Sequence, residues 1–149
     1  MECWFYHLEQ TDVAATLPPL LERCRQRGWR ALVRSPLPER LEALDALLWT
    51  YRDDSWLPHA VASGSQADAR QPVLLSALPG NGNAAQAVFR LDGAEEGPLD
   101  GVERVFVLFD GRDEEAVQRA RADFKAARTA GYEMAYWRQD GDGTWTRQA

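Results

Sequence analysis

Apolar and polar positions in the first thirty residues fall into a strand pattern and then a helix pattern. Residues 3–8 form a short aromatic and apolar run with few breakers, which predicts a first strand. Helical spacing follows, with Asp12 or the preceding threonine as N-cap and Gly28 as the stop. The positions expected to face inward are Val13, Leu17, Leu20, Leu21 and Cys24. Because proline fits the first turn of a helix best, ordered helix is expected to begin at Pro18 and Pro19.

The same alternation of periods repeats over the next segment. Residues 29–34 (WRALVR) alternate as a short strand does, and residues 36–49 return to helical spacing. Residues 63–71 are small and polar, which predicts a loop, and residues 72–77 read as a buried strand. A strand, helix, strand, helix opening is typical of a βαβ unit with a parallel sheet.

The second half of the chain adds strands around one long helix. Residues 79–83 (PGNGN) predict a turn, and residues 87–91 and 104–109 predict further strands. Three acidic residues at 113–115 favour a helix start there, since the backbone amides and the macrodipole attract negative charge. We expect this helix to run to about Thr129 and residues 132–137 to form a last strand before a short polar tail.

Composition is that of a single globular domain over residues 1–149. The chain is 45% hydrophobic, which suffices for one core. Its N-terminus lacks a basic leader and no window reaches the roughly 20 apolar residues of a membrane span, so we expect a cytoplasmic protein. The net charge of −6 disfavours direct binding to nucleic acid.

Candidate metal and redox chemistry is sparse. Cys3 and Cys24 lack the spacing of a metal or redox motif, so two buried thiols are expected. His7 and His59 form no ligand cluster with them. We therefore expect no metal site and no cofactor.

The turns that follow predicted strands carry few signs of catalytic chemistry. Residues 80–83 lack the Gly-Lys-Ser/Thr ending of a phosphate-binding loop. Asp110 and Asp113 at the end of a strand could hold magnesium for phosphoryl transfer or nucleotide binding, which is the enzymatic alternative. A turn followed by a helix N-cap explains the same residues more simply. No catalytic residue is assigned.

Three cations share one face of the long C-terminal helix. Arg121, Lys125 and Arg128 follow one another at offsets of four and three, which places them within about 60° on the helix, with Phe124 beside them. Such a face suits an acidic peptide with a terminal hydrophobic residue. The alternative is an ordinary solvated helix face with Phe124 in the core.

A second candidate surface is rich in aromatic residues. Residues 49–59 (WTYRDDSWLPH) combine three large aromatics with a polar, proline-marked loop. Aromatic side chains in loops often anchor protein interfaces. The alternative is a loop whose rings fold inward over the edge of the sheet, and composition does not separate the two.

Together these motifs resemble the chi subunit of bacterial DNA polymerase III over nearly the whole chain. Phe5 and Tyr6 look like the family's first-strand aromatic pair. The helix that ends at Trp49, followed by residues 55–59 (SWLPH), looks like its most recognisable motif. The helix over residues 121–128, running into Ala-Gly-Tyr at 130–132, is similar to its C-terminal signature. This sequence departs from the family pattern in carrying Trp56 where phenylalanine is expected.

The resemblance implies a fold and a set of partners. Chi proteins have a three-layer α/β/α fold with a mostly parallel mixed sheet, similar to nucleotide-binding domains but without the phosphate-binding loop. They are non-catalytic adaptors of the clamp-loader assembly, and they bind the acidic C-terminal tail of single-stranded-DNA-binding protein. The matching tail-binding residues are Arg121, Phe124, Lys125 and Arg128. A second partner, the psi subunit or a helicase-like repair protein, is expected at Trp49, Trp56, Leu57, Pro58 and His59.

Overall fold

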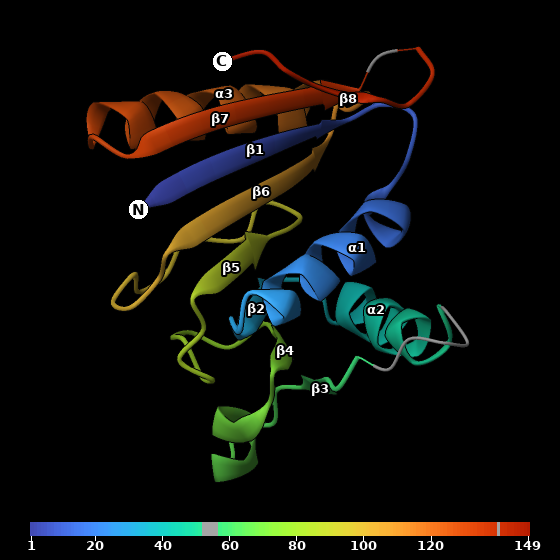
Figure 1. Cartoon of the computed structure of the whole chain (residues 1–149), viewed down its shortest axis with the longest axis vertical. Coiled ribbons are helices and arrows are strands. Elements are labelled where there is room, and N and C mark those ends of the chain that lie inside the picture. Colours follow the sequence, from blue (N-terminus) through green and yellow to red (C-terminus); the bar gives the residue numbers. More distant parts are fainter. Residues whose placement is uncertain (52–56, 140) are drawn as a thin grey trace.

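The computed structural model describes residues 1–51, 57–139 and 141–149, and its strands form one eight-stranded sheet (Figure 1). The strands are β1 (Glu2–Leu8), β2 (Ala31–Arg34), β3 (Ala60–Val61), β4 (Val73–Ser76), β5 (Ala87–Arg90), β6 (Arg104–Asp110), β7 (Glu133–Gln139) and β8 (Trp145–Arg147). The helices are α1 (Val13–Gln26), α2 (Pro38–Thr50) and α3 (Glu114–Thr129), with a 3-10 turn η1 (Gln66–Arg70). The strand order is β3-β4-β2-β5-β6-β1-β7-β8.

The sheet is parallel except at one edge. Among the described strands, those from β3 through β7 all pair in parallel, and β8 pairs antiparallel with β7. At the centre, Phe5 of β1 lies in register between Val107 of β6 and Tyr136 of β7. Parallel strands need crossover connections. Helix α1 lies between β1 and β2, α2 between β2 and β3, and α3 between β6 and β7, whereas β4, β5 and β6 follow one another without an intervening helix. The predicted α/β class with a mostly parallel mixed sheet is confirmed.

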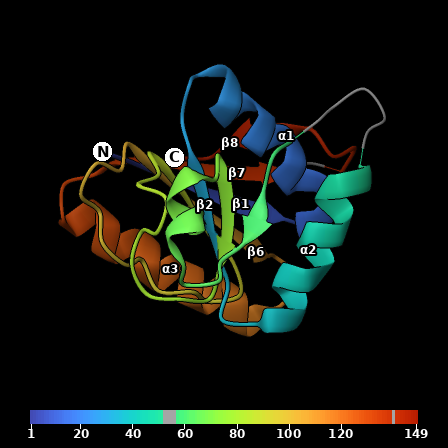
Figure 2. The same cartoon turned by 90° about the horizontal axis from the view of Figure 1, so that it is seen from below.

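Helices cover both faces of the sheet, which gives the expected three layers (Figure 2). One hydrophobic cluster joins α1 and α2 to one face, called here the α1 face, and a second joins α3 to the other, called the α3 face. Alternation along β1 feeds both clusters, because Phe5 belongs to the α3 cluster and Tyr6 to the α1 cluster.

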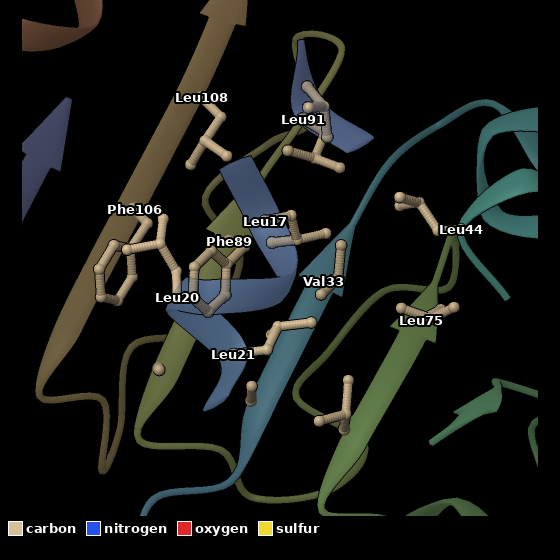
Figure 3. Packing of buried hydrophobic residues seen from close by; sticks show 14 of the residues in the cluster. Leu17, Leu20, Leu21, Val33, Leu44, Leu75, Phe89, Leu91, Phe106 and Leu108 are labelled. Carbon is tan, nitrogen blue, oxygen red and sulfur yellow. The ribbon is translucent and has the colours of Figure 1, made fainter. Parts of the chain in front are cut away.

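Leucines of α1 form the centre of the core on the α1 face. Figure 3 shows Leu17, Leu20 and Leu21 packed over the strands, close to Val33 and Phe89. Leu17 and Leu21 are fully buried. Complete burial of one such side chain contributes about 1.5–3 kcal/mol. The predicted inward positions of this helix are therefore confirmed.

The predicted start of α1 at its prolines was wrong. The helix begins at Val13, and both prolines lie inside it. Asp12 caps it, since its carboxylate accepts the backbone N–H of Ala15 at 3.0 Å. Pro18 is buried against the core while Pro19 faces solvent. The cap and the burial of the first turn outweigh the helix hydrogen bonds that the prolines remove.

Three short elements escaped sequence analysis. β3 and β8 are two and three residues long, and both lie at sheet edges, where pairing with a neighbour defines the strand. The 3-10 turn η1 lies inside the predicted loop, and Asp68 organises it by accepting the backbone N–H groups of Ser63 and Gly64. Such elements have too few residues to show a period of their own.

Both cysteines are free and buried, as expected. Burial raises the pKa of Cys3 to about 12 and that of Cys24 to about 11, so both are neutral thiols at physiological pH. Among the described residues, no helix combines the length and apolar character that a bilayer crossing requires.

An ion pair between Arg40 and Asp92 links the start of α2 to the segment that follows β5. Asp92 accepts two hydrogen bonds from the Arg40 guanidinium, at 2.9 and 3.0 Å, and one from the Ser35 hydroxyl at 2.7 Å. Its backbone is left-handed, with φ 56°, a conformation that aspartate and asparagine tolerate better than most residues. Burial opposes ionisation of this carboxyl, but the bonds from Arg40 and Ser35 outweigh it and lower its pKa.

We predict that Asp92→Asn lowers the free energy of unfolding by about 1–2 kcal/mol at neutral pH, because asparagine keeps the backbone conformation but loses the charge. A depressed pKa in the folded state means that the carboxylate stabilises the protein above its ordinary pKa of 3.8. The difference between the two proteins should shrink as pH falls below that value. Urea denaturation across pH measures it, with exposed Asp100→Asn as the control. A difference independent of pH would contradict the assignment.

Candidate functional site

The predicted basic face lies on α3, a helix whose ends are well defined. Asp113 is the N-cap, and its carboxylate accepts the backbone N–H groups of Glu115 and Ala116 at 3.0 and 3.4 Å. Gly131, with φ +89°, follows the C-terminal end as a left-handed residue that favours glycine. The helix predicted from 113 to about 129 is confirmed.

Small residues bring α3 close to the sheet. Ala116 and Ala120 are buried beneath the helix, and Phe124 is half-buried one turn further on. The Phe124 ring packs edge-on against Phe5 of β1 at 5.4 Å and against Tyr136 of β7 at 5.7 Å. Phe124 is therefore anchored in the core and still reaches the surface.

The cations beside this ring point to solvent. Arg121, Lys125 and Arg128 are exposed, and none makes an ion pair or side-chain hydrogen bond within the part of the chain that the structure describes. The Arg128 guanidinium lies 5.9 Å from the centre of the Phe124 ring. The structure thus brings together the four residues predicted from the sequence, hereafter the basic face.

Strand β7 adds residues that sequence analysis missed. Tyr136 and Met134 are half-buried on the α3 face, in the same hydrophobic cluster as Phe124. Tyr136 also stacks on Phe5, with ring centres 6.4 Å apart. They extend the apolar border of the basic face. Alternation along β7 was visible in the sequence, but only the neighbouring helix shows which side of that strand meets the cations.

A buried histidine lies within hydrogen-bond distance of the Tyr136 hydroxyl. His7 is buried, and its Nδ1 lies 2.7 Å from the Tyr136 hydroxyl. Burial, assisted by the charge of Arg138, lowers the pKa of His7, so the ring is neutral at pH 7. Burial also raises the pKa of Tyr136, against the nearby charges of Arg121 and Arg138. Gly111 lies so close that a Cβ there would overlap the imidazole.

The second predicted surface is split between solvent and core. Trp49, at the end of α2, is 56% exposed, whereas Leu57 and His59 are 2% and 6% exposed. Pro58 is half-buried. Trp56 lies outside the described residues. Of the described members of this surface, Trp49 and part of Pro58 present side chains that a partner can contact directly.

His59 contacts both α2 and the segment that follows it. Its Nδ1 lies 2.7 Å from the carbonyl oxygen of Leu57, and its Nε2 lies 3.2 Å from both the carbonyl and a carboxylate oxygen of Asp45. The imidazole also contacts the Trp49 ring, with centres 4.5 Å apart. His59 therefore orients Trp49 from inside the fold.

The carboxylates considered for catalysis already have structural roles. Asp110 accepts the backbone N–H of Arg112 at 2.9 Å and its guanidinium at 3.1 Å, and the backbone bond is the main reason that its pKa is lowered. Asp113 caps α3. A cleft of about 260 Å³ opens here at the carboxyl ends of β1, β5 and β6. Within the described ranges, no group of three or more His, Cys, Asp or Glu side chains is arranged to hold a metal ion.

Comparisons of the sequence with a family model and with a curated protein indicate the same protein family. The family model described as DNA polymerase III chi subunit, HolC, matches residues 1–135. The DNA polymerase III subunit chi of Pseudomonas aeruginosa is 27% identical over 134 residues, which cover 87% of this chain and 91% of that protein. The motifs around Trp49 and Arg121 both fall within the matched range, while β8 lies beyond it.

We predict that His59→Ala lowers the free energy of unfolding by about 2 kcal/mol or more, because it removes a buried ring and its polar contacts. Trp49→Ala should cost less than about 1 kcal/mol, since that ring is mostly in solvent. Thermal or urea denaturation of both variants checks this contrast. Equal destabilisation by His59→Ala and Trp49→Ala would contradict the structural role assigned to His59.

Proposed function

The chain belongs to the DNA polymerase III chi-subunit family, and we propose that it serves as a non-catalytic adaptor that binds the acidic C-terminal tail of single-stranded-DNA-binding protein. In this proposal residues 1–149 act as one domain in the bacterial cytoplasm. The observation that carries it is the basic face, where three cations without ion-pair partners among the described residues lie beside a half-buried phenylalanine.

The chemistry of the basic face suits such a tail. Arginine and lysine donate charge-assisted hydrogen bonds to carboxylates, and the rings of Phe124 and Tyr136 offer apolar contact to a hydrophobic end residue. The whole protein carries a net charge of −6, so an acidic peptide is attracted only where cations are concentrated. Local charge therefore gives the site its selectivity.

The proposed mechanism is tethering. Binding to a protein that already coats single-stranded DNA raises the effective concentration of the polymerase on its template without any covalent step. Linkage to the clamp loader then requires a second contact. We assign that contact to Trp49, Leu57, Pro58, His59 and Trp56. Trp49 is the direct ring contact, His59 packs against that ring, and the Leu57 carbonyl oxygen lies 2.7 Å from His59 Nδ1.

The partner on that second surface is the psi subunit or a helicase-like repair protein. Helices α2 and α3 cover opposite faces of the sheet, which supports simultaneous occupation of both surfaces (Figure 2). The enzymatic alternative, a magnesium-dependent reaction at Asp110 and Asp113, is less well supported because both carboxylates already bond to the backbone.

We predict that Lys125→Ala and Arg128→Ala each weaken binding of a fluorescent tail peptide by about 3- to 10-fold, since each removes one cation from the carboxylate site. Fluorescence anisotropy measures the affinity, which should fall as the salt concentration rises and should not change when magnesium is added. Arg119→Ala is the matched control, because this exposed cation lies on the far side of the same helix. Unchanged affinity in both test variants, with circular dichroism showing folded proteins, would refute the assignment.

We predict that Trp49→Ala abolishes copurification with the psi or helicase-like partner while leaving tail-peptide affinity unchanged. The reason is that a large exposed ring at an interface carries a disproportionate share of binding energy. Affinity purification followed by mass spectrometry compares the variant with the natural chain. Leu78→Ala, which also truncates an exposed apolar side chain, is the control. An undiminished partner yield with Trp49→Ala would contradict the proposed surface.

A further inference from the structure

A groove of about 430 Å³ lies on the α1 face, away from both surfaces assigned above. In Figure 1, β7 lies in front of α3 with β1 beside it, and the ribbons of α1 and α2 do not cross these two strands. The floor of the groove is formed by Trp4 and Tyr6 of β1, Trp137 of β7 and Trp145 of β8. Three of these four rings are only half-buried.

The floor is a continuous apolar surface. Tyr6 stacks on Trp137 at 6.3 Å and meets Trp145 edge-on at 5.1 Å, and Trp4 lies 5.9 Å from Trp137. All four belong to or pack against the core cluster beneath α1 and α2. The core of the α1 face therefore extends beyond the edge of α1 and stays open to solvent there.

One wall of the groove is the exposed side of α1. Ala15, Pro19 and Arg23 line it at a spacing of four residues, which places them one above another. Two of the three side chains are small, which permits close approach of another element. Arg23 is the only charged residue among those described as lining the groove, and it forms no ion pair with any part of the chain that the structure describes.

Aromatic rings beside arginines can also bind single-stranded nucleic acid, but the geometry here is unfavourable for it. Stacking requires a free ring face. One face of Trp4 is covered by the Arg104 guanidinium at 3.7 Å, and Arg104 is itself paired with Glu2 at 2.9 Å. The other rings pack against one another. One unpaired cation in the groove gives little attraction for a phosphate backbone.

We propose that this groove binds an amphipathic helix of a partner protein, with apolar side chains on the aromatic floor and a carboxylate against Arg23. A sheet face is normally covered by helices, and here the layer formed by α1 and α2 stops short of β7 and β8. The small residues of α1 allow a helix to lie alongside it at the usual 8–10 Å separation of roughly parallel helices. The unpaired cation selects an acidic helix over a basic one.

The test uses two synthetic amphipathic helices of equal length, one built from leucine and glutamate and the other from leucine and lysine. We expect the glutamate peptide to bind the full chain, change its tryptophan fluorescence and outcompete the lysine peptide. Arg23→Glu should weaken binding of the glutamate peptide about tenfold, and Ala15→Tyr should weaken it by narrowing the groove. Arg25→Glu, an exposed substitution on the same helix outside the groove, should leave binding unchanged.

Several results would overturn the proposal. One is the absence of binding of the glutamate peptide at concentrations up to about 1 mM, which corresponds to a binding free energy of only about −4 kcal/mol. Another is an equal loss of glutamate-peptide affinity in the Arg23→Glu and Arg25→Glu variants. If a fluorescent oligothymidylate bound more tightly than the glutamate peptide, and Arg23→Glu abolished that binding, the groove would be assigned to nucleic acid. Sedimentation showing a dimer that Ala15→Tyr disrupts would assign it to a second copy. Tail-peptide affinity should be the same in every groove variant, so failure here is distinguishable from failure of the proposed function.

Discussion

Burial of the central strands on both faces is the constraint on which the rest of the structure depends. β1 and β6 lie inside the sheet, and nearly all of their side chains enter one of the two cores. Phe5 and Tyr6 are neighbours in sequence yet anchor opposite cores. A one-residue slip of β1 would exchange them, so register and layer order are determined together. That order places α2 with Trp49 on one side of the sheet and α3 with its cations on the other.

The two candidate surfaces are both connected to these cores. The Phe124 ring of the basic face contacts Phe5 and Tyr136, so the three cations lie beside an apolar ring that is anchored in the core. Trp49 contacts His59, whose ring nitrogens lie 2.7 Å from the Leu57 carbonyl oxygen and 3.2 Å from that of Asp45. In both places a buried side chain, Phe5 or His59, contacts a ring that reaches the surface. Such preorganisation reduces the entropy lost when a partner binds.

Coverage of the sheet by helices is unequal, and this inequality has a physical cause. α1 and α2 both belong to crossovers between parallel strands, which ties them to the part of the sheet that those strands occupy. β8 pairs antiparallel with β7, and the described residues between these two strands include no helix. None of the described helices therefore covers the aromatic rings at that end of the α1 face.

The sequence by itself determined the main strands, the three helices, the inward leucines of α1 and the shared face of Arg121, Lys125 and Arg128. These follow from periodicity and capping, which are properties of neighbouring residues. Tertiary structure alone decided that Pro18 is accommodated within α1, that Tyr136 borders the cations, and that Leu57 and His59 are buried while Trp49 is exposed. Periodicity shows which residues share a side of an element, but only packing between distant segments shows what lies across from that side.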